Sequence, residues 1–340
     1  MLLKKKSRPL AVPVRQLSNM SVPVIVTIGK ATQDVFLLSS KSFEPHEHKG
    51  VLYEQLPLGQ KLDLDEVIFT TGGNVTNAAV TFARQGLHSK YIWAIGTDVA
   101  SQTILDDLDT EGIDTSSVVQ DESYRSSYSV ILLASSGERT ILNYHGTALP
   151  DDGHLIDMSA LASADWVYLS GLGDMTLLEL IVSHCIEHSV KIMLNPAGSE
   201  LREMDKLKTL LEDVEVLIVN KEEARQIVEG QTLEELARHA TNYCPVVIVS
   251  DGPNGAVATD SRTVVTAGMY DNVPVVDRTG GGDAFGSGFL SYFSQGQSLK
   301  DSIIFASANS TSVVGQVGAK AGILHRGTTL HDMPITEKDF

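Results

Sequence analysis

The repeated alternation of short apolar strands with helices constrains the fold of this chain more than any other feature. Residues 166–172 (WVYLSGL), 191–196 (KIMLNP) and 245–252 (PVVIVSDG) have the length and composition of buried strands. A helical pattern over residues 175–189 separates the first two of them. The rhythm also includes a strand at 215–220 and helices at 221–228 and 233–241. Repeated βα units of this kind predict a parallel sheet that is covered by helices on both faces.

Two hairpin-like blocks interrupt this rhythm, at residues 35–69 and 121–146. They lack helical periodicity, so they predict short strands of a separate small sheet over one edge of the large one. Residues 72–87 open with two glycines and continue with apolar residues at helical spacing, which predicts a turn that leads into a buried helix. The pattern therefore predicts one α/β domain over residues 21–330 with two accessory segments.

Composition and charge limit the classes of function. A chain of 340 residues with 42% hydrophobic residues is long enough for one large domain. Its formal net charge of -17 repels phosphate backbones, so we expect no nucleic-acid partner. The two cysteines, Cys185 and Cys244, form no C-x-x-C pair, which favours a reducing, cytoplasmic setting. No run approaches about 18 consecutive apolar residues, so we expect no membrane partner or membrane span.

The two ends of the chain are predicted to lie outside the domain. Residues 1–20 are basic but contain no apolar stretch of signal-peptide length, so they are predicted to be a disordered leader. An alternative is that translation starts at Met20. Residues 331–340 are predicted to be a C-terminal tail.

The run DRTGGGDAFGSGFL, residues 277–290, places three glycines directly before an aspartate. If residues 284–296 form a helix, GGGD is its first turn, whose free N–H groups bind anions. Glycines there remove the Cβ atoms that would keep a phosphate away. One carboxylate, Asp283, beside such a cradle suits phosphoryl transfer. A flexible turn with an N-capping aspartate remains the alternative, and no P-loop motif occurs in the chain.

Several segments resemble the ribokinase-like (PfkB) carbohydrate kinase family. The run at 277–290 resembles the family's C-terminal signature D-T-x-G-x-G-D-x-F, and GGNVTNAA at 72–79 resembles its glycine-glycine signature. VNKEEA at 219–224 resembles the N-x-x-E element. Residues 246–258 and 306–323 resemble the segments that flank the nucleotide. The features follow the family's order over residues 24–325, and they imply a three-layer α/β/α domain with a mainly parallel central sheet and a small β-sheet lid.

The resemblance implies ATP-dependent transfer of the γ-phosphoryl group to a hydroxymethyl group of a sugar or sugar-like molecule. Asp283 would be the general base, and the amides of Gly280, Gly281, Gly282 and Asp283 would form the anion hole. Asn220 and Glu223 would hold Mg²⁺ through water, which suits a hard cation with oxygen ligands. The alternative for this pair is a capping asparagine and a glutamate in the first turn of the next helix.

The remaining site residues divide between nucleotide and acceptor. Ser250, Gly252, Gly255 and Asn309 would contact the nucleotide; the alternative is a strand-end turn for the first three and a solvent-facing helix residue for Asn309. The residues expected to bind the acceptor are Asp34, Gly72, Gly73, Asn77 and Arg139. The alternatives for these are a loop charge for Asp34, a helix cap for Asn77 and a lid surface residue for Arg139.

Three further implications concern cations, partners and specificity. The resemblance allows a monovalent cation, K⁺, at Asp277, the Thr279 carbonyl and the loop at 318–322. It also implies a lid that closes over the sugar, at about residues 35–69 and 121–146, and that packs against a second subunit in a homodimer. The sequence departs from the family's pattern at three positions: Asn74 stands where ribokinases commonly carry lysine, Asn195 stands where many members carry aspartate, and Arg278 lies between Asp277 and Thr279. Because of these departures, the resemblance does not identify the acceptor molecule.

Two other functions compete with the sugar kinase. A nucleoside kinase that acts on adenosine or a relative would use the same base and anion hole. A non-catalytic, ligand-sensing regulator could share the scaffold. The presence of Asp283, Asn220 and Glu223 together argues against the regulator, because a sensor does not need them.

Overall fold

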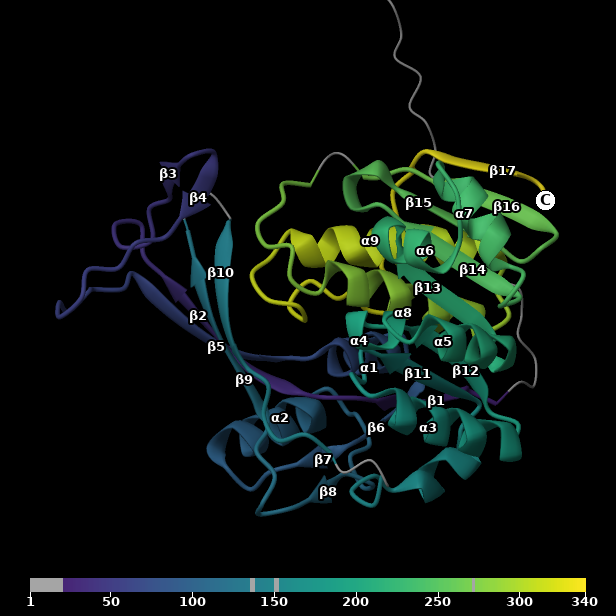
Figure 1. Cartoon of the computed structure of the whole chain (residues 1–340), viewed down its shortest axis with the longest axis horizontal. Helices are drawn as coiled ribbons and strands as arrows, with labels where there is room; N and C mark the ends of the chain where they lie inside the picture. Colours follow the sequence, from purple (N-terminus) through teal and green to yellow (C-terminus); the bar gives the residue numbers. More distant parts are fainter. Residues whose placement is uncertain (1–20, 135–137, 150–152, 271–272) are drawn as a thin grey trace, which may run out of the picture.

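A mainly parallel sheet forms the centre of the protein, as predicted, and within the described residues it has nine strands (Figure 1). The computed structural model describes residues 21–134, 138–149, 153–270 and 273–340, and the predicted leader, residues 1–20, lies outside them. The parallel strands, in spatial order, are β14 (Val246–Ser250), β13 (Val216–Asn220), β12 (Lys191–Asn195), β11 (Trp166–Ser170), β1 (Val24–Ile28) and β6 (His88–Ile92). Antiparallel strands extend the edge beyond β14, namely β15 (Ala256–Thr259), β16 (Thr263–Ala267) and β17 (Ile335–Asp339).

Helices cover both faces of this sheet because its crossovers run in two directions. From β1 the chain reaches β6 through α1 (Asn74–Arg84), whereas from β11 it moves strand by strand to β14, away from β1. Right-handed crossovers in opposite directions place their helices on opposite faces. The helices α8 (Gly281–Phe293) and α9 (Leu299–Val314) pack on the face of α1. The helices of the β11–β14 crossovers are α3 (Met175–Glu187), α4 (Gly198–Leu201), α5 (Met204–Leu210), α6 (Lys221–Ile227) and α7 (Leu233–Ala240).

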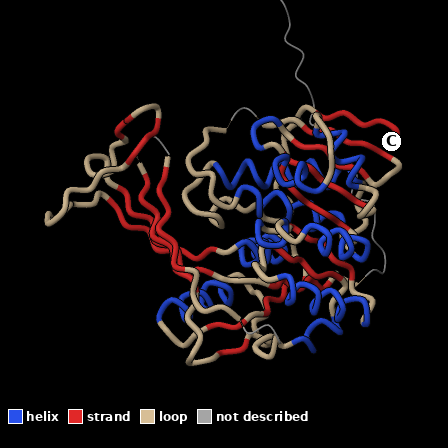
Figure 2. Tube along the Cα trace, viewed as in Figure 1, coloured by secondary structure: helices blue, strands red, loops and turns tan. Residues whose placement is uncertain are grey.

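A small sheet projects from one side of the central sheet as the predicted lid (Figure 2). Its strands, in spatial order, are β10 (Arg139–Tyr144), β9 (Ser127–Leu133), β2 (Thr32–Leu38) and β5 (Glu66–Gly72). Phe36, Ile131 and Leu133 form an apolar cluster on its inner face, against which Val317 of the loop after α9 packs. β2 starts before the predicted block at 35–69, and β5 ends after it. Residues 135–137 of the turn predicted in the second block lie outside the described residues.

The remaining elements lie between the strands of these two sheets along the chain. They are β3 (His46–His48), β4 (Val51–Tyr53), β7 (Ala94–Ile95), α2 (Val99–Thr110), β8 (Val119–Gln120) and 3₁₀ turns at Met158–Ser163, Leu211–Asp213 and Gly252–Asn254. In the part of the chain that the structure describes, no helix has the length and apolar character needed to cross a membrane.

Two local differences from the sequence prediction have physical reasons. The sequence predicts strand 191–196 followed directly by strand 215–220, but α4 and α5 lie between them; each is too short to display a clear helical period. Residues 331–340 are predicted as a tail, but β17 pairs with β16 in the central sheet. Its charged side chains suit an edge strand, and Lys338 forms an ion pair with Glu234 at 2.8 Å.

Candidate active site

The glycine run forms the first turn of α8. Gly280 is the residue before the helix and has φ 75, and a Cβ added to it would collide with Ala319. A Cβ on Gly281 would approach Val314 Cγ1 to 2.9 Å, whereas one on Gly282 would meet nothing within 4 Å. Asp283 lies inside the helix and is not its N-cap, so that alternative is wrong. The turn therefore offers backbone N–H groups beside open space.

One pocket lies between this turn and the lid, and we call it the lid pocket. Its volume is about 310 Å³, and most of its lining residues have polar side chains. The lining residues include Lys30, Asp34, Gly73, Asn74, Asn77, Ser129, Asn143, His145, Ser170, Gly280 and Asp283. The pocket opens where β1 and β11 end side by side, at the point where the direction of the crossovers reverses. Ligands of open α/β sheets bind at such switch points.

Another pocket lies on the opposite side of the same turn, and we call it the β14 pocket. Its volume is about 280 Å³, and apolar side chains contribute much of its lining. The lining residues include Ser250, Gly252, Gly255, Met269, Val275, Arg278, Gly281, Gly282, Phe285 and Val314. The start of α8 is thus a wall between the two pockets: Gly280 and Asp283 face the lid pocket, and Gly281 and Gly282 face the β14 pocket.

Asp283 has the electrostatics of a base that works near neutral pH. Its Oδ2 accepts a hydrogen bond of 2.8 Å from Asn77 Nδ2 of α1. Burial raises the pKa of Asp283 from 3.8 to about 6, and the Asn77 bond lowers it less than burial raises it. A carboxylate with such a pKa is ionised at pH 7 yet remains a usable proton acceptor.

Asp34 and Asn77 present buried oxygen atoms to the lid pocket. Asp34 lies in β2, and burial raises its pKa to about 6, while Ser129 and Lys320 lower it. Within the described part of the chain, neither Asp34 Oδ1 nor Asn77 Oδ1 has a hydrogen-bond partner. Gly72 makes room for this arrangement, because a Cβ there would collide with Asp34 Oδ2. Two unpartnered buried acceptors require donors, and hydroxyl groups of a ligand would supply them.

A row of polar contacts crosses the carboxyl ends of three strands beside this pocket. Asn74 Nδ2 donates to Ser170 Oγ at 3.1 Å, Ser170 Oγ donates to Asn195 Oδ1 at 3.1 Å, and Asn195 Nδ2 donates to the Ile218 carbonyl at 2.9 Å. The two departures Asn74 and Asn195 are therefore linked through one serine. This linkage is not visible in the sequence, because 121 positions separate Asn74 from Asn195.

Lys30 and the residues that β9 and β10 bring to the lid pocket were not predicted from the sequence. Ser127 and Ser129 come from β9, and Asn143 and His145 come from β10 or directly follow it. The alternation of serines at 127 and 129 is the available signal, since alternate residues of a strand share a face.

Three of the four predicted nucleotide residues meet in the β14 pocket. Ser250, Gly252 and Gly255 line it, and Gly255 has φ 90. The prediction for Asn309 is corrected: it is fully buried in α9. Its Nδ2 donates to the Ala284 carbonyl at 2.8 Å, and its Oδ1 accepts from the Leu324 amide at 2.9 Å. Asn309 therefore joins α8 to α9 and to the following loop, and its amide is not free to contact a nucleotide.

Asn220 and Glu223 form a capping box at the start of α6. Asn220 Oδ1 accepts from the amides of Glu222 and Glu223, and Glu223 Oε2 accepts from the Asn220 amide, each at 2.9 Å. Burial raises the pKa of Glu223. Asn220 pairs in register with Ser250 of the β14 pocket. Because these oxygens already accept hydrogen bonds from the start of the helix, the pair would contact a Mg²⁺ through water; the described residues contain no cluster of three metal-binding side chains.

Arg139 faces Asp277 instead of the lid pocket, which corrects its predicted place beside the acceptor. Its Nε lies 3.8 Å from Asp277 Oδ1. Asp277 Oδ1 also accepts from Thr279 N and Oγ1, and Oδ2 accepts from the Gly318 amide. A guanidinium beside this carboxylate does not fit a K⁺ site at the same oxygens.

The family assignment follows from comparison with known proteins. The model of the pfkB family carbohydrate kinases matches residues 50–326. The chain belongs to the PfkB family of carbohydrate kinases. The kinase is 26% identical over 310 residues to the ribokinase of Staphylococcus aureus (strain COL), with 88% of this chain and 96% of the relative covered. The protein is therefore a phosphotransferase, and the family to which it belongs is one of sugar kinases.

Solved structures establish the fold of the kinase, but they do not distinguish between a sugar and a nucleoside as its acceptor. The Arabidopsis thaliana ribokinase complexed with ribose and ATP has a TM-score of 0.73 and 20% identity, and the match covers 90% of this chain and 97% of that one. The adenosine kinase from Sinorhizobium meliloti has a TM-score of 0.71 and 19% identity over 88% of this chain and 96% of that one. Because the two scores are nearly equal, the acceptor has to be inferred from the pocket.

Proposed function

We propose that the kinase transfers the γ-phosphoryl group of ATP to a hydroxymethyl group of a sugar or sugar-like molecule in the lid pocket. The main support for the proposal is that the first turn of α8 separates the two pockets, of which the lid pocket is the more polar, and supplies residues to both. A donor and an acceptor in these two pockets would meet at this turn. Asp283 is the ionisable group on the acceptor side of the turn.

On the donor side, the adenine would occupy the β14 pocket beside Phe285 and Val314. The phosphates would point toward the amides of Gly281 and Gly282, where helix N-termini favour anions. The exposed Arg278 lines the same pocket and adds positive charge. Mg²⁺, when bound, would neutralise phosphate charge, with Glu223 and Asn220 holding its waters.

On the acceptor side, Asp283 would remove the proton of the attacking hydroxyl. The new bond joins this oxygen to the γ-phosphorus, the bond to the β-phosphate oxygen breaks, ADP leaves, and the proton stays on Asp283 until solvent takes it. Asn77 holds the carboxylate in place through its 2.8 Å hydrogen bond. The amides of residues 280–283 would stabilise negative charge on the transferring group.

The lining of the lid pocket favours a polyhydroxyl acceptor over a nucleoside. Its described lining contains no phenylalanine, tyrosine or tryptophan, and Ile131 and Ile141 are its large apolar members. A nucleobase is commonly held by stacking on an aromatic ring. Hydroxyl groups would instead satisfy the free oxygens of Asp34 and Asn77. The nucleoside kinase remains the second candidate because an adenosine kinase shares the fold.

A panel of acceptors tests this proposal. Ribose, fructose, 2-keto-3-deoxygluconate and adenosine are each incubated with ATP and Mg²⁺, and ADP is detected with a coupled assay. We expect acceptor-dependent ADP release with at least one of the sugars or the sugar acid and a much lower kcat/KM with adenosine. Preference for adenosine would reverse the order of the two candidates. ATP binding without turnover on any acceptor would favour the regulator.

We also propose that two copies pair through the outer face of the lid in a cytoplasmic homodimer. The register places Phe69, Val35, Val130 and Leu142 in one row across the four described strands of the lid. Phe69 is 70% exposed and Leu142 is 56% exposed at the two ends of the row, whereas Val35 between them is buried. An apolar row of this kind on a projecting sheet is typical of a protein interface. The free, buried thiols of the two cysteines suit a reducing compartment.

A further inference from the structure

Asp277 is a buried carboxylate at the meeting point of two loops. It is 1% exposed, and its oxygens accept hydrogen bonds from Thr279 N at 3.0 Å, Thr279 Oγ1 at 2.7 Å and Gly318 N at 3.0 Å. These bonds join the loop before α8 to the loop after α9. All three donors are neutral, so they leave the negative charge of Asp277 without compensation. A buried carboxylate requires a positive charge nearby.

The lid supplies this charge through Arg139. The Nε of Arg139 lies 3.8 Å from Asp277 Oδ1, and in the described part of the chain this buried nitrogen has no hydrogen-bond partner. The guanidinium of Arg139 therefore supplies the counter-charge that the Asp277 carboxylate lacks. In turn, Asp277 is the nearby acceptor for a buried nitrogen that has no hydrogen-bond partner among the described residues. A second cation at the same oxygens would be repelled by the guanidinium at short range.

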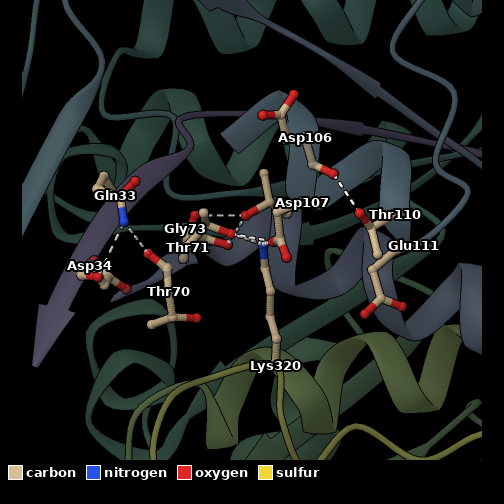
Figure 3. Close-up of polar contacts among 12 residues, drawn as sticks. Gln33, Asp34, Thr70, Thr71, Gly73, Asp106, Asp107, Thr110, Glu111 and Lys320 are labelled. Atoms are coloured by element: carbon tan, nitrogen blue, oxygen red, sulfur yellow. Dashed lines mark hydrogen bonds and ion pairs between the residues drawn. The ribbon is translucent and has the colours of Figure 1, made fainter. Parts of the chain in front are cut away.

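A second protein cation, Lys320, anchors the loop after α9 to the base of the lid. Its Nζ lies 2.8 Å from Asp107 Oδ2 of α2 and 2.5 Å from Thr71 Oγ1 of β5. Figure 3 shows Lys320 extending from this loop toward both partners, and Thr71 Oγ1 also donates to Asp107. Ala319, the neighbour of Lys320, packs against Gly280 of the anion hole. The position of this loop therefore decides where the first turn of α8 can lie.

We propose that Arg139 takes the place of a monovalent cation at Asp277 and acts as a positioning residue for the anion hole. Its fixed charge holds the loops of Asp277 and Gly318 together only when the lid lies over them. The kinase then needs no K⁺, and the closed lid and the aligned anion hole form together. This inference rests on the proposed kinase function.

The test compares wild-type kinase with Arg139→Gln, Arg139→Lys and the matched control Arg262→Gln, which changes an exposed arginine of the turn between β15 and β16. Phosphorylation of the best acceptor is measured in K⁺, Na⁺ and choline chloride at equal ionic strength. We expect the wild-type and Arg262→Gln rates to differ by less than about twofold among the salts. Arg139→Gln should lose about tenfold or more in kcat in choline and regain part of it in K⁺, and Arg139→Lys should stay independent of K⁺.

Thermal unfolding in the same salts gives a readout that does not depend on activity. K⁺ should raise the unfolding midpoint of Arg139→Gln relative to choline, and it should leave that of the wild type unchanged. A wild-type kinase that requires K⁺, or that is stabilised by it specifically, would overturn the proposal. So would an Arg139→Gln variant with wild-type kcat in choline. If no acceptor is phosphorylated in any salt, the proposed function fails, while the unfolding comparison still decides whether Arg139 replaces the ion.

Discussion

Replacing Asp283 with asparagine should lower activity and raise stability at the same time. Asparagine has nearly the same shape, and its side-chain oxygen can still accept the hydrogen bond that Asn77 donates at 2.8 Å. The change removes the negative charge and the proton acceptor and leaves the first turn of α8 in place. Because general-base catalysis contributes about 10²–10⁴-fold, we expect kcat to fall by about that factor with ATP affinity nearly unchanged.

The expected gain in stability follows from the pKa of Asp283. Burial raises this pKa from 3.8 to about 6, so the folded protein favours the protonated form. The stability that comes from the protonated group is full below about pH 4 and is lost as the pH rises through about 6. The full rise would correspond to about 3 kcal/mol, and because Asp283 is only half-buried we expect about 1–2 kcal/mol at pH 7. Asparagine cannot ionise, so the variant should be more stable than the wild type at pH 7 and equally stable at pH 4.

Two assays and one control separate this account from general damage. Acceptor-dependent ADP release is followed from pH 5 to 8 at saturating acceptor, where wild-type kcat should rise through a pKa of about 6 and that of the variant should be flat. Thermal unfolding is measured at about pH 4 and pH 7. Asp109→Asn changes an exposed carboxylate of α2 and should alter neither result. Near-normal kcat, or a variant that is less stable than the wild type at pH 7, would refute the reasoning.

Three further predictions concern the acceptor, the metal and the assembly. Asp34→Asn should raise the KM for the acceptor by about tenfold or more, because the buried oxygen of Asp34 would bind a hydroxyl group. If Asp283 is the base, the apparent pKa of kcat should stay near 6 in this variant. An unchanged KM would show that Asp34 does not bind the acceptor. EDTA should abolish transfer, and Glu223→Gln should raise the Mg²⁺ concentration needed for half-maximal rate; transfer in EDTA would exclude the magnesium role. Phe69→Asp should shift the elution of a dimer to that of a monomer, and monomeric wild-type protein would contradict the lid interface.

The sequence predicted the parts of the site that lie close together in the chain. Gly280 to Asp283 form one helix turn, so their backbone and carboxylate could be placed relative to each other before the fold was known. Asn220 and Glu223 are also local, and the structure shows the capping alternative to be correct in geometry. Their contact with magnesium stays a prediction.

The parts that depend on the lid and on distant contacts were not predictable in the same way. Ser129 and His145 reach the pocket only because two separate strands pair with β2 or with its neighbour. Asn309 was placed beside the nucleotide by resemblance, yet its hydrogen bonds reach Ala284 and Leu324, 25 and 15 positions away. Arg139 was correctly placed in the lid, but its partner Asp277 lies 138 positions further along the chain.

Transfer of label from [γ-³²P]ATP shows directly whether Asp283 promotes phosphorylation of the acceptor. Wild-type kinase and Asp283→Asn are incubated with labelled ATP, Mg²⁺ and the best acceptor of the panel, and the products are separated. We expect wild-type kinase to place the label on the hydroxymethyl oxygen of the acceptor, and we expect Asp283→Asn to bind ATP but to transfer label at least about 10²-fold more slowly. Label found only as inorganic phosphate, or equal transfer by the two proteins, would contradict this expectation.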